Sequence, residues 1–415
     1  MRVLWFANTP CNADEYFNSE LRGTGGWLKA LDIELQEHVE LHIAFYSKYN
    51  AEPFRYKKTT YYPIFMKKTF LSKTYEWVTN HVIFKEHLDI YLKIIDHVKP
   101  DIIHVHGTEN PFGYIIEKIN VPVVISIQGI ITTYYHKYFT GFGRKYLYIN
   151  NFRNKKLLGI LQNYSKKYKF FYKMMIREKE ILSRCKYIIG RTDWDYYTTR
   201  ILAPNSKYYH VDEILRKSFY DNAGKWQPHN RNKLVVFTTT GPSFYKGLET
   251  ACQALWELQN IGIDVEWRFA GIQESDLIVR VVKKYLGTKY YGKGIKYLGS
   301  LNEKELVEQL LDADVYVMPS HIENSPNSLC EAQMLGLPCV ATHAGGTKSI
   351  LNEGNILIQD GDPWAMAGAI TNLISKTNLN FKNKIKINEE TFKRHDKNKI
   401  IKNLVDTYLQ IIKNE

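Results

Sequence analysis

Short apolar runs alternate with longer amphipathic stretches along almost the whole chain. Most apolar runs are continuous, as expected of parallel strands that are buried on both faces of a sheet. The intervening stretches 75–98, 247–259, 303–311 and 364–374 carry apolar residues at helical spacing. This alternation predicts an α/β fold with doubly wound parallel sheets. The predicted strands are 3–8, 41–46, 101–106, 121–128, 187–190 and 207–211, followed by 234–240, 265–270, 296–299, 315–319, 338–342 and 356–358.

Two sets of about six strands predict two Rossmann-like domains. The chain has 415 residues, which is enough for two well-developed cores. Residues 217–232 are polar and contain glycine and proline, so they are expected to form a linker or hinge. The last residues form an amphipathic pattern that predicts a terminal helix. The expected domains are 1–216 and 217–390, with a C-terminal helical segment at 391–415.

The segment from Glu323 to Glu331 is the most informative motif, because two carboxylates bracket a predicted helix start. Ser325 is a good N-cap and Pro326 suits the first helical position, so a helix is expected from 327 to 335. Gly336 then suits the helix end. Carboxylates accept hydrogen bonds from hydroxyls, and a helix start offers free N–H groups. The motif therefore fits a sugar nucleotide.

Together with 335–338 and the glycine turn 344–346, this motif resembles the C-terminal signature of retaining family-4 glycosyltransferases of the GT-B fold. The resemblance implies two Rossmann-like domains facing across a cleft, with a C-terminal helix that crosses back to the N-terminal domain. It assigns sugar hydroxyls to Glu323 and the nucleotide ribose to Glu331, while His321 either touches the sugar or caps a strand. The donor-binding residues it implies are Gly25, Gly26, Gly241, Ser243, Lys246, Glu323, Asn324, Ser325, Pro326, Asn327, Ser328, Leu329 and Glu331.

A second motif, the loop 241–247, follows the strand 234–240. Its Lys-Gly order differs from that of a P-loop, which disfavours a nucleoside triphosphatase. It resembles the family's loop in which a lysine contacts the donor diphosphate, and Lys246 takes that role. The family's usual arginine is missing and Pro242 stands in its place. Either Lys246 acts with Ser243 and backbone amides, or an arginine from elsewhere supplies the second charge; Arg191 and Arg216 are the candidates.

The predicted N-terminal domain carries two further candidates. Residues 23–26 are glycine-rich and resemble the family's loop that faces the diphosphate and the acceptor. His104 and His106 share one face of the strand 101–106. A strand histidine is more often a hydrogen-bonded core residue. The resemblance nevertheless gives His106, at the carboxyl edge, a positioning role, so the expected catalytic residues are His106, Lys246 and Glu323.

Charge is concentrated in one segment. The net charge is +13, and residues 141–190 hold thirteen basic and two acidic side chains (13 − 2 = +11). This segment is also rich in aromatic residues, which suggests contact with the anionic inner face of a membrane. A solvated helix whose aromatics belong to the core explains the pattern equally well. Nucleic acid is disfavoured because no recognised nucleic-acid motif accompanies the charge.

No apolar run reaches the ~18 residues that a membrane span needs, and the five cysteines lack metal or disulfide spacing. We therefore expect a cytoplasmic enzyme with no cofactor or metal, and peripheral contact with the membrane is one of the two interpretations of the basic segment. The resemblance implies a hexosyltransferase of capsule or lipopolysaccharide biosynthesis that moves a sugar from a nucleotide-sugar to a glycan or polyprenyl-linked glycan. The alternatives are a catalytically silent nucleotide-sugar-binding subunit, or another GT-B enzyme such as a sugar-nucleotide epimerase or a phosphorylase.

Overall fold

The computed structural model describes residues 1–17, 26–65, 84–142, 155–290, 293–377 and 389–415. Within them the chain forms two compact units, and each is described here by itself. Unit 1 consists of Met1–Tyr135, Lys169–Ile214 and His395–Glu415. Unit 2 consists of His136–Tyr168 and Leu215–Arg394.

Unit 1 is built on an eight-stranded sheet with the order β3-β4-β2-β1-β5-β6-β7-β8. All neighbouring strands are parallel except β3, which runs antiparallel to β4. The order reverses between β1 and β5, so a topological switch point lies there. The strands are β1 (Arg2–Ala7), β2 (Glu40–Ser47), β3 (Phe54–Tyr56), β4 (Thr59–Phe65), β5 (Ile102–His106), β6 (Val123–Ser126), β7 (Tyr187–Gly190) and β8 (Lys207–His210).

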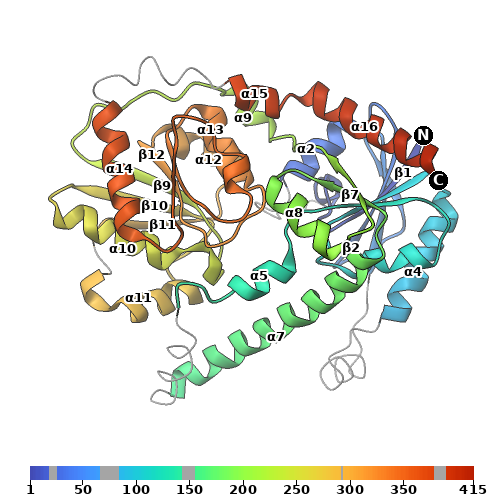
Figure 1. Cartoon of the computed structure of the whole chain (residues 1–415), viewed down its shortest axis with the longest axis horizontal. Coiled ribbons are helices and arrows are strands. Elements are labelled where there is room, and N and C mark those ends of the chain that lie inside the picture. The colour runs from blue at the N-terminus through green and yellow to red at the C-terminus, as the bar shows by residue number, and fades with distance from the viewer. Residues whose placement is uncertain (18–25, 66–83, 143–154, 291–292, 378–388) are drawn as a thin grey trace. The chain divides into compact units, whose positions relative to one another are not determined.

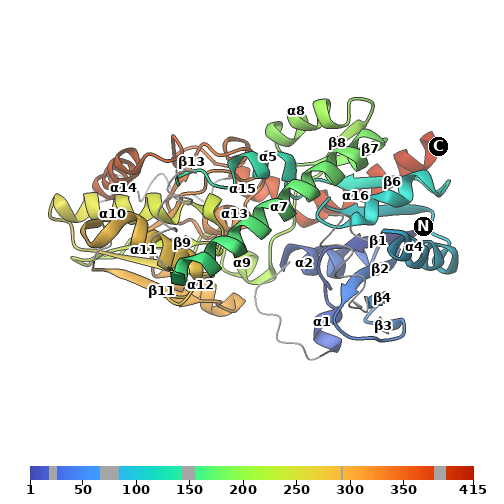
Figure 2. The same ribbon diagram turned by 90° about the horizontal axis from the view of Figure 1, so that it is seen from below.

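Helices cover both faces of this sheet (Figures 1 and 2). On one face, α4 and the end of α7 join the strands in a large apolar core. On the other face, the Tyr408 hydroxyl of α16 lies 3.2 Å from Trp5 Nε1 and 2.6 Å from His104 Nδ1, and α16 also contacts α2. The helices are α1 (Ala13–Tyr16), α2 (Gly26–Leu35), α4 (Phe84–Val98), η1 (Pro111–Glu117), α5 (Ile131–Lys137), α7 (Lys155–Ser183), α8 (Asp193–Leu202) and α16 (Lys397–Asn414), of which α5 and α7 cross between the units along the chain.

Unit 2 contains a six-stranded parallel sheet with the order β11-β10-β9-β12-β13-β14. Its switch point lies between β9 and β12, because successive strands lead away from β9 on one side and from β12 on the other. The strands are β9 (Leu234–Thr239), β10 (Val265–Ala270), β11 (Ile295–Gly299), β12 (Val315–Met318), β13 (Cys339–Thr342) and β14 (Ile356–Ile358).

Two helical layers enclose the unit 2 sheet. Helix α10 contacts both α11 and α14 on one side, whereas α9, α12 and α13 pack on the other over a core that includes Phe237, Tyr316 and Leu329. The helices are α9 (Lys217–Asp221), η2 (Phe244–Lys246), α10 (Leu248–Asn260), α11 (Leu277–Tyr290), α12 (Glu303–Leu311), α13 (Asn327–Leu335), η3 (Thr347–Ser349), α14 (Pro363–Thr377) and α15 (Glu389–Arg394).

The predicted fold class is confirmed, and all twelve predicted strands are present. Strands β3 and β4 were not predicted from the sequence. They lie at one edge of the unit 1 sheet, where polar residues and Pro63 interrupt the apolar pattern. The predicted helix 75–98 corresponds to α4 from Phe84 onward, and residues 75–83 lie outside the described residues.

The division of the chain differs from the predicted one. The predicted linker 217–232 belongs to unit 2, because Phe219 and Trp226 are buried there and the Trp226 N–H donates to the Leu335 carbonyl at 3.0 Å. Residues 136–168 and α15 also belong to unit 2. Near the predicted boundary, the chain therefore passes from unit 1 to unit 2 immediately after Ile214.

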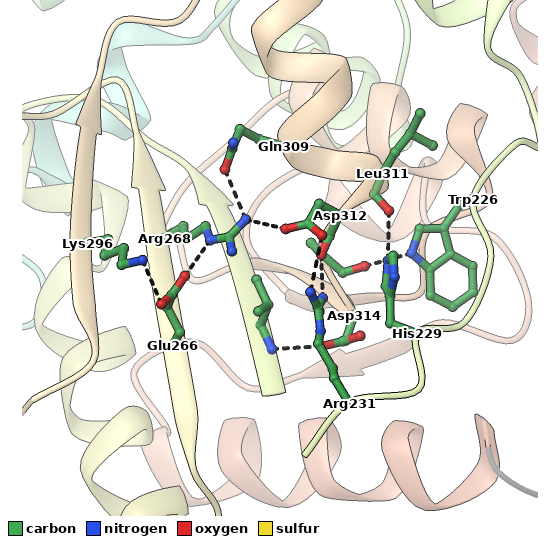
Figure 3. Close-up of polar contacts among 12 residues, drawn as sticks. Trp226, His229, Arg231, Glu266, Arg268, Lys296, Gln309, Leu311, Asp312 and Asp314 are labelled. Carbon is green, nitrogen blue, oxygen red and sulfur yellow. Dashed lines mark hydrogen bonds and ion pairs between the residues drawn. The ribbon is translucent and has the colours of Figure 1, made fainter. Parts of the chain in front are cut away.

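A polar network fixes this segment at the amino edge of the unit 2 sheet (Figure 3). Arg231 pairs with Asp312 at 3.2 Å and with Asp314 at 3.1 Å. Arg268 binds Asp312 and Glu266, both at 2.7 Å. A hollow of about 310 Å³ lies beside Arg231 and Asp314. Because these charged groups pair with one another, the network is structural.

Among the described residues, no helix combines the length and the hydropathy that crossing a bilayer requires.

Candidate active site

Two loops leave the unit 2 sheet at its switch point. One follows β9 and leads through η2 to Lys246, and the other follows β12 and leads to Glu323. In open parallel sheets, ligands bind outside the carboxyl ends of the strands at this place. The topology therefore brings two residues that are far apart in the sequence to the edge where a ligand site is expected.

The two loops are tied together by their backbones. The His321 N–H donates to the Tyr245 carbonyl at 2.7 Å. Gly247 has φ +70°, and a Cβ atom there would lie 1.9 Å from the Pro319 carbonyl oxygen. Only glycine allows both this left-handed conformation and this close approach. The Lys-Gly order at 246–247 thus has a packing reason.

Lys246 and Glu323 form an ion pair, with Nζ 2.6 Å from Oε1. The Ser320 hydroxyl donates to the same carboxylate oxygen at 2.8 Å. Burial lowers the pKa of Lys246, but the neighbouring Glu323 charge outweighs it and the net shift is upward. Lys246 is therefore a cation, and 27% of its side chain remains exposed to a ligand.

The glycine turn at 344–346 packs against the backbone carbonyl of Glu323. The Gly346 N–H donates to the Glu323 carbonyl at 3.0 Å. Gly345 has φ +57°, and a Cβ atom there would lie 2.0 Å from that same oxygen. The turn fixes the backbone of Glu323 and so limits where its carboxylate lies.

Helix α13 occupies the predicted residues, and Gly336 closes it in the left-handed conformation. The predicted cap is wrong: Pro326 is the N-cap and the helix starts at Asn327, without a side-chain cap hydrogen bond. Proline has no side-chain oxygen, so residue 326 cannot accept a hydrogen bond from the first N–H groups of the helix. Ser325 lies one residue before the cap.

Glu331 lies inside α13 and is buried. Both of its oxygens accept hydrogen bonds from Arg216, from Nε and from one terminal nitrogen, each at 2.7 Å. Arg216 thus binds Glu331, whereas the other sequence candidate, Arg191, belongs to unit 1.

Some of the remaining predicted donor residues are open to a ligand, and others are buried or already hydrogen-bonded. Gly241 has open space around its Cα, and Ser243 is half-buried. Asn327 carries a buried Oδ1 without a hydrogen-bond partner. Asn324 and Leu329 are buried, Leu329 in the apolar core, and Ser328 accepts a hydrogen bond from the Tyr316 hydroxyl at 2.9 Å. The Gly241 backbone and the Ser243 and Asn327 side chains are therefore the best placed of these residues to contact a ligand.

His321 stands at the centre of a buried charge cluster that the sequence did not reveal. Its Nε2 lies 2.6 Å from Glu249 and its Nδ1 lies 3.5 Å from Asp360. Lys137 lies 3.7 Å from the same Asp360 carboxylate. Burial lowers the pKa of His321, but the two carboxylates outweigh it and raise the pKa to about 9. His321 is a buried imidazolium, so the prediction that it touches the sugar or caps a strand missed its two partners.

Aromatic residues from the 136–168 segment pack on the Lys246 loop. The Phe142 and Phe139 rings lie 5.0 Å and 5.3 Å from the Phe244 ring, centroid to centroid. A Cβ atom at Gly141 would lie 2.1 Å from Glu249 Oε1. This packing explains why the segment belongs to unit 2.

In unit 1, His106 ends β5 at the switch point between β1 and β5. It is fully buried, and neither ring nitrogen has a hydrogen-bond partner. Its ring stacks on that of His104 at 3.9 Å and lies 4.5 Å from that of Trp5. Burial lowers the pKa of His106 well below the usual range, so the ring is neutral. His104, by contrast, hydrogen-bonds Tyr408 and Ser126, as a structural histidine does.

The glycine loop of unit 1 is described only in part. Gly26 is the first residue of α2, whereas Gly25 lies outside the described residues. Trp27 follows, and its ring lies 4.2 Å from the Arg191 guanidinium and 5.9 Å from the His106 ring. Arg191 also lies 3.6 Å from Glu213. Arg191 is thus held by residues of unit 1.

Part of unit 2 resembles known glycosyltransferases. Residues 232–376, which include both switch-point loops of unit 2, match the family Glycosyl transferases group 1. D-inositol 3-phosphate glycosyltransferase of Corynebacterium urealyticum is 36% identical over 85 residues, 20% of each chain. TuaC of Bacillus subtilis, provisionally named a teichuronic acid biosynthesis glycosyltransferase, is 34% identical over 80 residues, 19% of this chain and 21% of TuaC. The chain thus spans about a fifth of the length of these curated relatives.

Solved structures match over nearly the whole chain. Sucrose-phosphate synthase of Thermosynechococcus elongatus has a TM-score of 0.70 at 13% identity and covers 100% of this chain and 99% of its own. Anabaena HepE in complex with UDP-glucose has a TM-score of 0.64 at 13% identity and covers 99% and 100%. At this identity the likeness establishes the fold. Residues 232–376 thus resemble the family Glycosyl transferases group 1, and the chain as a whole has the GT-B fold.

Proposed function

We propose that this protein is a retaining glycosyltransferase that transfers a sugar from a nucleotide-sugar to a hydroxyl of a glycan or lipid-linked glycan in surface polysaccharide biosynthesis. The observation that carries the proposal is the Lys246–Glu323 pair at the switch point of the domain that matches the family. A cation and a carboxylate side by side suit the two ends of the bond that breaks, the phosphate and the sugar.

In the proposed reaction, Lys246 binds the donor diphosphate and stabilises the charge that develops as it leaves. Glu323 accepts hydrogen bonds from the sugar hydroxyls, and Glu331 accepts them from the ribose. Pro242 lacks the charge that an arginine would provide, so the remaining stabilisation comes from the Ser243 hydroxyl and from backbone N–H groups of the loop. Positioning and charge stabilisation carry the catalysis.

The acceptor hydroxyl attacks the same face of the sugar from which the diphosphate departs, so the anomeric configuration is retained. The leaving phosphate oxygen takes the acceptor proton, and no enzyme nucleophile is required. Neutral His106, with unpartnered ring nitrogens, is suited to bind an acceptor or sugar hydroxyl. A neutral imidazole can donate with one nitrogen and accept with the other.

The first experiment is a thermal-shift screen of nucleotide-sugars, because a true donor stabilises the fold by mass action. The stabilising donor is then incubated with polyprenyl-linked glycan acceptors, and the product is analysed by NMR. We expect a product with the anomeric configuration of the donor. A product of inverted configuration would overturn the retaining mechanism, and a screen without any stabilising nucleotide-sugar would overturn the proposal.

One alternative, a catalytically silent binding subunit, is favoured by Pro242 in place of the expected arginine. The two functions differ in turnover: the enzyme releases nucleoside diphosphate when acceptor is added, and Lys246→Ala abolishes this release. A subunit would bind the donor without releasing product. A sugar-nucleotide epimerase would instead convert the donor without acceptor.

The acceptor class rests on the relative named for teichuronic acid biosynthesis and on α7. The exposed side of this helix carries Tyr172 and Ile176, each about half exposed, beside Lys169 and Lys179. Apolar and basic side chains on one face bind anionic lipid surfaces. We infer that this face contacts the inner side of the membrane.

A vesicle sedimentation assay tests the inferred membrane contact. The double change of Tyr172 and Ile176 to serine should weaken binding to phosphatidylglycerol vesicles. Serine at Tyr197 and Ile201 of α8, which are also exposed, provides the matched control. Equal binding by both variants and the unmodified protein would remove the inference.

A further inference from the structure

The Arg216–Glu331 pair combines a fork-like geometry with burial. The Arg216 guanidinium donates through Nε and one terminal nitrogen to the two Glu331 oxygens, each at 2.7 Å. Glu331 has 6% and Arg216 19% of the side chain exposed. Two parallel charge-assisted hydrogen bonds fix both the position and the plane of a carboxylate. Glu331 therefore has little freedom to reorient.

This geometry leaves part of the carboxylate available. An ionised carboxylate has about four lone-pair positions, two on each oxygen, and the guanidinium occupies one on each. One position per oxygen remains, and these two diverge to opposite sides of the carboxylate, away from the arginine. Each can accept a hydrogen bond from a single hydroxyl, so a ribose hydroxyl can bind Glu331 without displacing the arginine.

Arg216 is itself well anchored. It is the N-cap residue of α9, and its guanidinium carbon lies 4.9 Å from the centre of the Phe219 ring. The next residue but one, Ser218, donates its N–H to Glu303 at 2.8 Å. Arg216 also follows the chain crossing at Ile214 by two residues. The backbone of Arg216 is fixed at the start of α9 and its guanidinium is fixed beside the Phe219 ring, so Arg216 can hold Glu331 in place.

We propose that Arg216 is a positioning residue that holds the Glu331 carboxylate in a fixed orientation, so that one of its free lone pairs accepts a hydroxyl of the donor ribose. This inference rests on the proposed function, which assigns the ribose to Glu331. Arg216 itself does not touch the donor in this arrangement and acts through Glu331.

Arg216 also affects the ionisation of Glu331. Burial raises the pKa of Glu331, and the arginine opposes that shift. Without the guanidinium, burial favours the protonated acid, which donates one hydrogen and loses acceptor capacity. Lysine at this position restores the charge but provides a single point donor, so it keeps Glu331 ionised without fixing its plane. The two substitutions therefore separate charge from alignment.

The experiment compares the affinities of ribose and dideoxyribose nucleotides by calorimetry. UDP, GDP and ADP and their 2′,3′-dideoxy forms are titrated into the protein, and the tightest-binding pair is used. A hydrogen bond to a charged group contributes about tenfold, so the unmodified protein should prefer the ribose form by at least about tenfold. The variants are Arg216→Lys, Arg216→Met and Glu331→Gln.

We expect Arg216→Lys to reduce the preference to about threefold and Arg216→Met to abolish it, since a misaligned or neutral carboxyl loses these bonds. Arg268→Lys is the matched control, because Arg268 also binds carboxylates at 2.7 Å but at the amino edge of the sheet. It should keep the full preference. A loss of stability alone weakens both nucleotides equally and leaves their ratio unchanged.

The outcomes separate the inference from the proposed function. If Glu331→Gln loses the preference and both Arg216 variants keep it, Arg216 has no positioning role while the ribose site stands. If Glu331→Gln keeps the preference, or if none of the nucleotides binds, the assignment of Glu331 fails and the inference fails with it. If Arg216→Met does not fold, the ratio measured with Arg216→Lys decides.

Discussion

Lys246 Nζ lies 2.6 Å from Glu323 Oε1, so two predicted donor-binding residues hold each other. Their spacing in the sequence is 77 residues, and the switch point of the unit 2 sheet brings them together. In the proposed complex, the donor contacts both members of this pair: its diphosphate binds Lys246 and its sugar hydroxyls donate to Glu323. The pair thus keeps both side chains extended toward the ligand edge before the donor arrives.

Replacing Lys246 by methionine should weaken the binding of nucleoside diphosphate by at least about tenfold, because one charged contact to phosphate contributes ~1.5 to 3 kcal/mol. The binding of the nucleoside itself should change little. Calorimetric titration with UDP and uridine, or with the matching pair for the donor's base, measures the difference. Glu323→Gln is the control, since it keeps the lysine and should retain diphosphate binding. Equal losses for nucleoside and diphosphate would contradict the assignment of Lys246.

The two stacked histidines of β5 should respond oppositely to phenylalanine. His106→Phe removes a buried imidazole whose nitrogens have no hydrogen-bond partner, so stability should hold or rise while transferase turnover falls at least about tenfold. His104→Phe breaks hydrogen bonds to Tyr408 and Ser126 and should destabilise unit 1 by about 1 to 3 kcal/mol.

Thermal unfolding and nucleoside diphosphate release measure the two histidine effects. A His106→Phe variant with full turnover would show that this histidine is only a packing residue.

Periodicity was sufficient to predict the architecture. Continuous apolar runs such as β9 and β12 mark strands buried on both faces, and their regular alternation with helices implies parallel sheets. The edge strands β3 and β4 carry polar residues and escaped prediction. The linker predicted at 217–232 differs for a related reason: these residues are polar in composition, but Phe219 and Trp226 are buried in the unit 2 core.

The candidate site was predictable only where the residues are close in sequence. The Glu323–Glu331 motif and the Lys-Gly loop carry local signals, since glycine and proline mark turns. Glu249, Asp360 and Lys137 surround His321 from three separate parts of the chain. Ordinary surface acids and lysines have the same local appearance, so no sequence pattern distinguishes these three. Arg216 was named as a candidate for the phosphate, but its observed partner is Glu331.

Gly345 should tolerate alanine much less well than Gly354. Both glycines have positive φ, +57° and +88°, but a Cβ atom meets the Glu323 carbonyl oxygen at 2.0 Å only at position 345. The strain of the left-handed conformation costs ~1 to 2 kcal/mol in both variants, and the difference between them isolates the clash. We expect Gly345→Ala to lower both stability and donor affinity and Gly354→Ala to lower only stability. Equal donor affinity in the two variants would show that the turn does not position Glu323.

The stability of unit 2 should fall as the pH rises, because of His321. Its pKa in the folded state is about 9, above the ordinary value of 6.5. The stabilisation by Glu249 and Asp360 is therefore complete below about pH 6.5 and disappears as the pH rises through about 9. A shift of this size corresponds to at most about 3 kcal/mol.

His321→Gln provides the comparison, since glutamine can still donate to Glu249 but does not titrate. Melting temperatures of both proteins are measured from about pH 6 to about pH 10, where the folded-state titration occurs. The unmodified protein should lose its advantage of several degrees over the variant across this range, because the positive charge that the two carboxylates require is lost. The pKa of Asp360 is lowered, chiefly by its hydrogen bond to His321, so this carboxylate stays charged there and the difference between the two curves reports His321. Parallel curves would mean that the histidine is not a buried cation.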